Sequence, residues 1–288
     1  MLGWIAIQHS STESRGSIHL LDLDSRSDVR YDLPGRPGFF AETDRPGVVV
    51  IGLERRLALF DLIRAQLRET GVHLPEDESV IINDGIAIEG GLVFGTKHLG
   101  FSRPIARLYH FDAAKRELEV LRPDLICSNG KHLYQREGVE YMIDIDSPTR
   151  RIEEFRVDFK NHAMTLERVV ADLTHLVEVP DGLRATPDGK SVVVAFYHPG
   201  DVSDGVARQI SIETGEIEVE WRFPGAPRVT CPEFVELEGA VKLVCTTAVE
   251  GMPADLRLRA PRSGDLFVAE TTFAELPPAP PPFPAGSL

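Results

Sequence analysis

The chain has 288 residues, of which 42% are hydrophobic and 26% are charged, and its formal net charge at pH 7 is −14. Such an acidic chain is poorly suited to follow a phosphate backbone, so we expect no nucleic-acid partner. The longest apolar run, at residues 48–51, is far too short to cross a bilayer, so we expect no membrane partner. Strong acidity fits binding of cations or neutral polyols instead.

The cysteines and the N-terminal residues predict a cellular location. Cys127, Cys231 and Cys245 are an odd and sparse set, so we expect reduced thiols in place of a disulfide framework. The apolar stretch at residues 4–7 is too brief for a secretory signal peptide. We therefore expect a cytoplasmic protein that acts as a monomer or a dimer.

A strand signature, in which alternating apolar residues are often followed by Asp, recurs six times in chain order. Its copies lie at residues 17–22, 56–61, 107–112, 151–155, 208–212 and 265–268. Further strands are predicted between them, at residues 48–53, 91–95, 140–145, 192–196 and 242–246. Six units in 288 residues average 288/6 = 48 each, close to the ~40–50 residues of a four-stranded propeller blade.

Helical periodicity is weak throughout the chain, and residues 59–70 are interpreted as a strand followed by a loop. The clearest unit is a hairpin with strands at residues 183–186 and 191–196 and a turn at residues 187–190. The segment from 276 to 284 is proline-rich and is expected to lie on the surface, although it could also help to close the ring.

The predicted fold is an all-β, six-bladed β-propeller with four-stranded antiparallel blades. It would occupy residues 1–275 as one domain, followed by a proline-rich C-terminal tail at residues 276–288. A two-sheet sandwich is the alternative, but near-constant repeat spacing favours radial repetition.

A second series of short motifs precedes the strands that should lie nearest a common axis. Its members are Pro37-Gly38-Phe39, Asn83-Asp84-Gly85, Ser128-Asn129-Gly130, Pro180-Asp181-Gly182 and Cys231-Pro232-Glu233. From Asn129 to Asp181 is 181 − 129 = 52 residues, and from Asp181 to Glu233 is 233 − 181 = 52. Asp84, Asn129, Asp181 and Glu233 would then occupy matching places, where their oxygens suit Ca²⁺, Mn²⁺ or Zn²⁺. Each Asp-Gly or Asn-Gly could equally be a simple turn.

These motifs, in this order and spacing, resemble the family of gluconolactonase, senescence marker protein (regucalcin) and luciferin-regenerating enzyme. Phe94-Gly95-Thr96, Asp146-Ser147-Pro148-Thr149, Cys231, the strand at residues 244–248 and Ser263-Gly264-Asp265 extend the resemblance over about residues 15–270. The resemblance implies a six-bladed propeller that holds one divalent metal ion (Ca, Zn, Mn or Mg) and hydrolyses sugar lactones.

Carried over to this chain, the resemblance implies that Asn129 and Asp181 are metal ligands and that Asp181 is also the catalytic carboxylate. Asn83 would touch substrate or a bound water. The metal would polarise the lactone carbonyl while Asp181 moves the proton. Glu233 is a third candidate ligand, and a solvated loop acid is the alternative for it.

Two features depart from the family pattern. No residue matches the family's first ligand, a Glu before a Pro, so we expect either closure by the C-terminal segment or a start upstream. Ile81 stands where the family often has an Arg that would grip a sugar acid. Lys97 and His98 open a loop at the substrate side and are further candidates for substrate binding, with an ordinary exposed loop pair as the alternative.

The function predicted first is a metal-dependent hydrolase that opens a lactone ring, with a small lactone or sugar acid as its partner. The alternative is a catalytically impaired propeller that binds a divalent cation and a small polyol or lactone. Hydrolysis of a phosphotriester or another ester at the same site is a third possibility.

Overall fold

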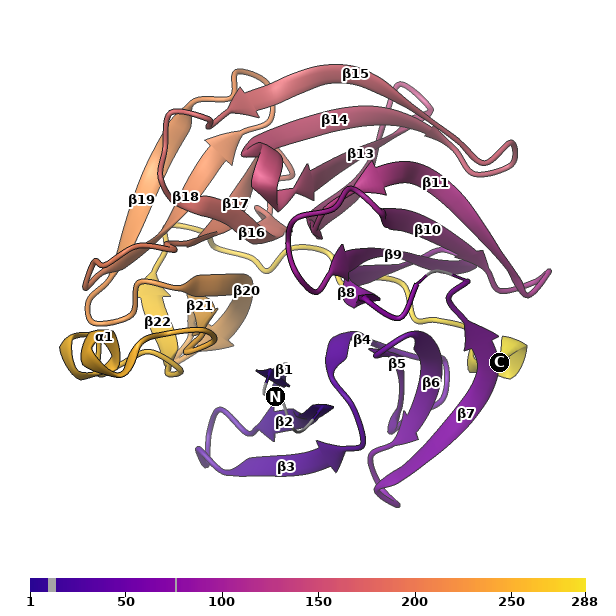
Figure 1. Ribbon diagram of the computed structural model, residues 1–288, viewed down its shortest axis with the longest axis horizontal. Helices are drawn as coiled ribbons and strands as arrows, with labels where there is room; N and C mark the ends of the chain where they lie inside the picture. The colour runs from indigo at the N-terminus through magenta and orange to yellow at the C-terminus, as the bar shows by residue number, and fades with distance from the viewer. Residues whose placement is uncertain (10–13, 76) are drawn as a thin grey trace. The chain divides into compact units, whose positions relative to one another are not determined.

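The computed structural model describes residues 1–9, 14–75 and 77–288. Almost all regular structure in these residues is β-strand, arranged as six antiparallel sheets (Figure 1). Four sheets have four strands, and the first and last sheets of the chain have three described strands each. The fold is a six-bladed β-propeller, as the repeat predicted.

The chain divides into two compact units, which are described separately. Unit 1 comprises Met1–Ser128, Asp158–Met164 and Pro280–Leu288, and unit 2 comprises Asn129–Val157 and Thr165–Ala279. The prediction of a single domain over residues 1–275 stays a prediction.

Unit 1 contains three sheets in which strands that follow one another in the chain pair with one another. Their strands are β1 (Leu2–His9), β2 (Ser14–Leu21) and β3 (Asp28–Leu33); β4 (Pro37–Glu42), β5 (Val48–Leu53), β6 (Arg56–Asp61) and β7 (Gln66–His73); and β8 (Val80–Ile88), β9 (Gly91–His98), β10 (Ala106–Asp112) and β11 (Glu117–Leu125). Here β4 and β8 are called leading strands, because each comes first in its sheet and lies at one edge of it.

A stack of aromatic rings forms the middle of the unit 1 core. The ring centroids of Phe39 and Phe94 lie 5.8 Å apart, and those of Phe94 and Tyr109 lie 5.7 Å apart. Alternating side chains on strands of two sheets meet here, as expected when pleated sheets bury one face against each other.

The end of the C-terminal segment also belongs to this core, although residues 278–282 are exposed, as predicted. Phe283 is fully buried and pairs with Thr43 in a parallel bridge, and its N–H donates to the Glu42 carbonyl at 2.9 Å. The Asp44 carboxylate accepts a bond from the Ala285 N–H at 2.8 Å. Prolines lack the N–H that a strand needs, so the segment makes one bridge instead of a full ladder. Its single phenylalanine supplies the buried anchor.

Unit 2 also contains three sheets with the same pairing order. Their strands are β12 (Ser128–Arg136), β13 (Val139–Asp146), β14 (Arg151–Asp158) and β15 (Ala163–Asp172); β16 (Val179–Ala185), β17 (Ser191–Tyr197), β18 (Gly205–Ser211) and β19 (Ile217–Phe223); and β20 (Val229–Leu237), β21 (Ala240–Thr247) and β22 (Leu266–Glu270). The leading strands are β12, β16 and β20. The predicted hairpin and turn at residues 183–196 are confirmed as β16 and β17.

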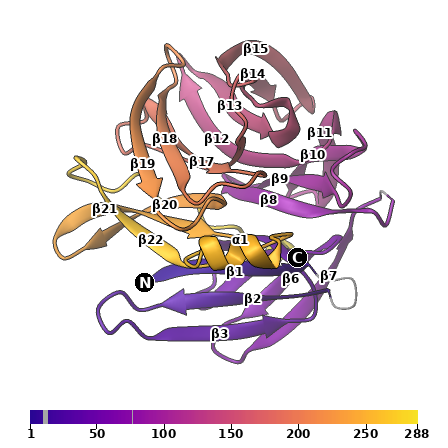
Figure 2. The ribbon, with the colours of Figure 1, turned by 60° about the vertical axis from the view of Figure 1, so that its left-hand side comes forward.

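One short helix, α1 (Ala254–Arg259), was not predicted from the sequence. It lies beside β22 in both views of the ribbon (Figures 1 and 2) and packs Leu256 against Met252 and Ala260. Arg259 also forms ion pairs with Asp255 in the helix and with Asp201 in a preceding loop. A helix of six residues is too short to give a periodic pattern that the sequence could reveal.

Candidate active site

A β-bulge interrupts four of the leading strands near their first residues. The register shifts between Pro37 and Phe39 in β4, between Ile82 and Asp84 in β8, between Pro180 and Leu183 in β16, and between Val229 and Cys231 in β20. The extra residues are therefore Gly38, Asn83, one of Asp181 and Gly182, and Thr230. A bulge redirects one side chain out of the ladder, and bulges are common beside active sites.

Close approaches between leading strands show which residue matches which. A Cβ built on Gly182 would lie only 2.7 Å from the Thr230 carbonyl oxygen, and one on Gly130 would lie 2.8 Å from the Asp181 carbonyl oxygen. Gly130 therefore relates to Asp181 as Gly182 relates to Thr230. Because Gly130 and Gly182 are equivalent, the residues before them, Asn129 and Asp181, are equivalent too. Thr230 faces Gly182 as Asp181 faces Gly130, so Thr230 has the same position on the third strand.

Asn129 is held in a fixed orientation on β12. Its side chain is buried, and its Nδ2 donates a hydrogen bond of 2.7 Å to the Ser147 hydroxyl. The amide oxygen is thereby directed away from Ser147. The buried Lys131 ammonium group donates to the backbone carbonyl of Asn129 at 2.8 Å, which supports this part of the strand. Because a rigid amide keeps its oxygen in one place, Asn129 is well suited to bind a cation.

Asp181 lies beside a neutral phenol on β17. Burial raises the pKa of Tyr197 to about 12, and the negative charges of Glu250 and Asp181 raise it further while the Arg228 charge opposes them. The Tyr197 hydroxyl donates to the Glu250 carbonyl at 3.0 Å, and the Arg228 guanidinium lies over the tyrosine ring. Tyr197 therefore stays protonated at neutral pH.

Asn83 occupies the bulge of β8 in unit 1. Its Nδ2 donates to the Ser128 carbonyl at 2.8 Å, so the side chain is tied to the residue that precedes Asn129 in the sequence. Asp84 follows the bulge and is paired with Gly95 in the regular ladder. The expectation that Asp84 matches Asp181 in position is therefore wrong, and Asn83 is the residue that the bulge turns out of the ladder.

Lys97 and His98 end β9 in unit 1 and are both buried. Lys97 lies opposite Ile81, and its ammonium group sits 5.6 Å from the ring centre of Phe101 in the following loop. His98 Nδ1 accepts the backbone N–H groups of Ser102 and Arg103 at 3.3 and 3.2 Å. His98 thus anchors the loop through one nitrogen, which fixes its tautomer when the ring is neutral. Contact of either residue with substrate stays a prediction.

Glu233 does not have the phase of Asp181, which corrects the sequence-based expectation. It lies three residues beyond the bulge and pairs with Val244 in the regular ladder. Its carboxylate forms an ion pair of 2.9 Å with Arg184 and accepts the Phe234 N–H at 2.9 Å. The bulge of β16 is at residue 181 or 182 and that of β20 at residue 230, which are 230 − 181 = 49 or 230 − 182 = 48 residues apart, so the assumed constant spacing of 52 pointed to the wrong residue.

The donor set at these bulges consists of one carboxylate and neutral oxygens. Within residues 1–9, 14–75 and 77–288, no group of three or more His, Cys, Asp and Glu side chains is placed to hold a metal ion. Asn129 and Asp181 would therefore supply two protein oxygens, and water or substrate would complete the coordination. Such an oxygen set fits a hard divalent cation held weakly.

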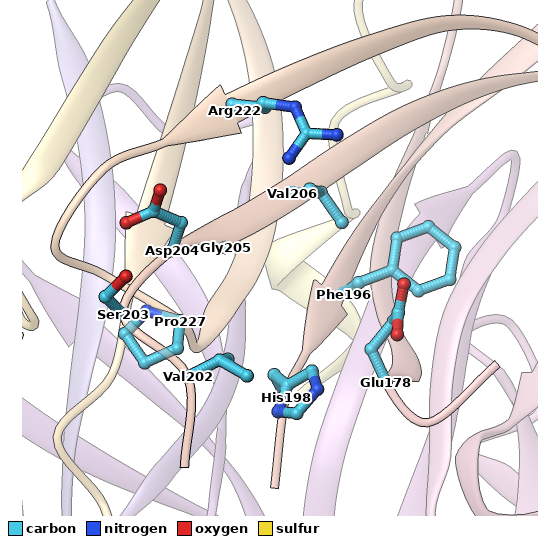
Figure 3. Close-up of a pocket in the computed structure, with 10 residues that line it drawn as sticks. All are labelled: Glu178, Phe196, His198, Val202, Ser203, Asp204, Gly205, Val206, Arg222 and Pro227. Atoms are coloured by element: carbon cyan, nitrogen blue, oxygen red, sulfur yellow. The ribbon is translucent and has the colours of Figure 1, made fainter. Parts of the chain in front are cut away.

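A separate cavity of about 260 Å³ lies at the end of the β16–β19 sheet where β16 begins. Among the described residues its lining comprises Glu178, Phe196, His198, Val202, Ser203, Asp204, Gly205, Val206, Arg222 and Pro227. Figure 3 shows Arg222 at one end of this space and His198, Val202 and Glu178 toward the other. Glu178 is bound to Arg208 at 2.7 Å, and His198 Nδ1 accepts the Gly200 N–H at 3.1 Å. Both polar groups therefore have structural partners, and none of the predicted site residues lines the cavity.

The chain matches the family model of the SMP-30/gluconolactonase/LRE-like region over residues 12–249. It belongs to this family. The match covers all strands of the four four-stranded sheets and the four bulges described above, so the residues compared above lie inside it.

Two curated relatives differ in how much of their length they share with the chain. An uncharacterised protein of Sulfolobus acidocaldarius is 33% identical over 153 residues, which are 53% of this chain and 52% of that protein. The chain thus spans about half the length of that relative. An L-arabinolactonase of Azospirillum brasilense is 29% identical over 255 residues, which are 85% of this chain and 77% of that enzyme.

Solved structures show the same fold at low sequence identity. A calcium-binding regucalcin from Agrobacterium tumefaciens has a TM-score of 0.77 at 18% identity and covers 98% of this chain and 93% of its own. A luciferin-regenerating enzyme has a TM-score of 0.74 at 18% identity, with 97% and 94% covered. In the part of the chain that the structure describes, no helix is long and apolar enough to cross a bilayer.

Proposed function

We propose that the protein is a metal-dependent hydrolase that opens the ring of a small sugar lactone. The observation that carries this proposal is the matching position of Asn129 and Asp181 on neighbouring leading strands of unit 2. Family membership and the L-arabinolactonase relative support the reaction class. The calcium-binding regucalcin supports a divalent cation as cofactor.

Asn129 and Asp181 would hold the cation through their side-chain oxygens. When bound, a divalent cation polarises the lactone carbonyl and lowers the pKa of water. The Asp181 carboxylate accepts a proton from the attacking water as the new C–O bond forms at the carbonyl carbon. It then returns the proton to the ring oxygen as the C–O bond of the lactone breaks, which leaves a hydroxy acid.

Unit 1 has its own candidates for substrate binding. Asn83 is the bulge residue of β8, which supports its role in binding substrate or an ordered water. Lys97 lies opposite Ile81, so its ammonium group is a cation close to where the family often has an arginine. His98 would support this group by holding the loop from residue 99 to 105 in place.

The small number of protein ligands predicts weak metal binding. With one carboxylate and one amide, the dissociation constant for Ca²⁺ or Mn²⁺ is expected near 10⁻⁴ to 10⁻³ M, in the range of low-charge oxygen sites. The test is hydrolysis of gluconolactone and L-arabinolactone by protein treated with EDTA, before and after addition of Ca²⁺, Mn²⁺, Zn²⁺ or Mg²⁺. We expect turnover to disappear and then to return with at least one ion, but not in the Asp181→Ala variant.

A binding protein without turnover is the second candidate, and the departure of Glu233 from the site favours it, because only one carboxylate is left. In that case calorimetry would detect cation binding that depends on Asp181, while no lactone is hydrolysed with any ion. Turnover that persists in EDTA would contradict the metal dependence. Turnover that persists in Asp181→Ala would contradict the catalytic role of Asp181.

A further inference from the structure

The third leading strand of unit 2, β20, has polar groups at its bulge to which the sequence motifs assigned no role. Thr230 occupies the bulge, Cys231 follows it, and Thr246 on β21 pairs with Cys231. Thr230 and Thr246 are half-buried and Cys231 is exposed, so all three reach accessible space.

This group lies directly against the strand that carries Asp181. A Cβ on Gly182 would lie 3.1 Å from the Cys231 Sγ and 2.7 Å from the Thr230 carbonyl oxygen. Only a glycine lets the two backbones approach this closely. Thr230 and Asp181 therefore occupy equivalent positions on adjacent strands, with no side chain at residue 182 between them.

Hydrogen bonds hold the Thr230 hydroxyl in place. The Thr246 hydroxyl lies 3.3 Å from the Cys231 carbonyl, to which it can donate. The two threonine hydroxyls lie 2.7 Å apart, and either oxygen can be the donor in that bond. Because a hydroxyl has one proton and two lone pairs, the Thr230 oxygen keeps a lone pair for a ligand hydroxyl in both arrangements.

We propose that Thr230, positioned by Thr246, is a substrate-binding residue that accepts a hydrogen bond from a hydroxyl group of a polyhydroxylated lactone or its sugar acid. The proposal rests on the proposed function for the identity of the reacting ring. It adds a specificity determinant for hydroxylated ligands, formed by the last leading strand. Cys231 is next to Thr230 and is exposed, whereas Cys127 and Cys245 are buried, so a thiol reagent should modify Cys231 selectively. The rate of that modification would report whether a ligand is bound at Thr230.

The first experiment compares KM and kcat of wild type and Thr230→Val on gluconolactone and on γ-butyrolactone, which has no hydroxyl substituents. Loss of one hydrogen bond is expected to raise KM for gluconolactone about three- to tenfold, with kcat nearly unchanged and no change for γ-butyrolactone. Thr230→Ser should restore KM. Thr247→Val is the matched control on the same sheet, because its hydroxyl donates to the Asp265 carbonyl in the following loop.

The second experiment does not need turnover. The alkylation rate of Cys231 by iodoacetamide is measured with and without saturating gluconate, and Cys231→Ser identifies the labelled thiol. We expect gluconate to slow alkylation at least threefold in wild type and to lose this protection in Thr230→Val. Protection without any lactonase activity would support the Thr230 site while the proposed function fails.

Two results would overturn the proposal. One is an equal change of KM for both lactones in Thr230→Val, which would show a general structural effect. The other is an alkylation rate of Cys231 that gluconate leaves unchanged in a protein that hydrolyses gluconolactone.

Discussion

The two units use the same backbone feature but place different side chains on it. In unit 1 the bulges of the leading strands hold Gly38 and Asn83, neither of which carries a charge. In unit 2 the equivalent positions hold Asn129, Asp181 and Thr230, so the carboxylate of the set is in unit 2. In β4, β8, β16 and β20 a bulge turns a residue out of the regular ladder, and the residue type at that position decides the chemistry.

The units also differ in what stabilises them. Unit 1 buries the C-terminal segment through Phe283, whereas in unit 2 the described ion pairs include a buried one between Glu154 and Arg168 at 2.9 Å. Changes at the bulges of unit 2 should therefore affect reactivity, and changes at the C-terminal anchor of unit 1 should affect stability. Four predictions test this division, in order of decreasing effect.

The largest effect is expected for the bulge carboxylate. Asp181→Asn keeps an oxygen ligand but removes the proton acceptor, so lactone turnover should fall about 10²- to 10⁴-fold. Glu233→Gln, which changes a carboxylate three residues beyond a bulge, should alter turnover less than about threefold, because this group is half-exposed and serves an ion pair. Initial rates on gluconolactone check both, and similar losses in the two variants would contradict the assignment.

The next effect is on the stability of unit 1. Phe283→Ala removes a fully buried ring and should lower the free energy of unfolding by about 3–5 kcal/mol. Phe101→Ala changes an exposed ring and should cost less than about 0.5 kcal/mol. Urea denaturation followed by tryptophan fluorescence measures both. Equal midpoints for Phe283→Ala and wild type would show that the C-terminal segment is not part of the core.

A smaller effect is expected where two leading strands touch. Gly182→Ala forces a methyl group against the Thr230 carbonyl and should destabilise the protein by about 1–3 kcal/mol while weakening metal binding. Gly286→Ala is the control, because its new Cβ would meet no atom nearer than 3.8 Å. Thermal melting and calorimetric titration with Mn²⁺ give the two readouts, and normal Mn²⁺ affinity in Gly182→Ala would contradict the shared site.

The smallest effect concerns pH. Burial, with the Arg184 charge, lowers the pKa of His132 to about 4, below its ordinary value of 6.5. The folded state therefore favours the neutral ring. The resulting contribution to the free energy of unfolding is complete above pH 6.5 and is lost as the pH falls toward 4. Between pH 7 and pH 5 this should cost about 1–2 kcal/mol of unfolding free energy.

His132→Phe, which keeps the stacking on Tyr134, should lose less stability over the same pH interval than wild type. Urea denaturation at pH 7 and at pH 5 measures the difference. Equal pH dependence in the two proteins would show that His132 does not contribute.

One loop arrangement occurs in both units and was only half visible in the sequence. His98 and His198 each follow the second strand of a sheet, and each accepts backbone N–H groups of the next loop through Nδ1. The sequence suggested a loop that borders a site only after Lys97 and His98. Their shared role as loop anchors depends on hydrogen bonds that no spacing rule contains.

By itself, the sequence was sufficient to predict six repeats, the second and third strands of the four-stranded sheets, the hairpin at residues 183–196 and the family, because alternating polarity and turn residues are local signals. The last strands β7, β11, β15 and β19 were not predicted, and residues 66–70, which were expected in a loop, belong to β7. Only the tertiary structure decided which residue of each leading strand matches Asp181. Bulges and loops change the number of residues between leading strands, so an assumed equal spacing pointed to Glu233, whereas the strand register points to Thr230. The burial of Phe283 was likewise decided by partners far away in the chain, which a proline-rich composition cannot indicate.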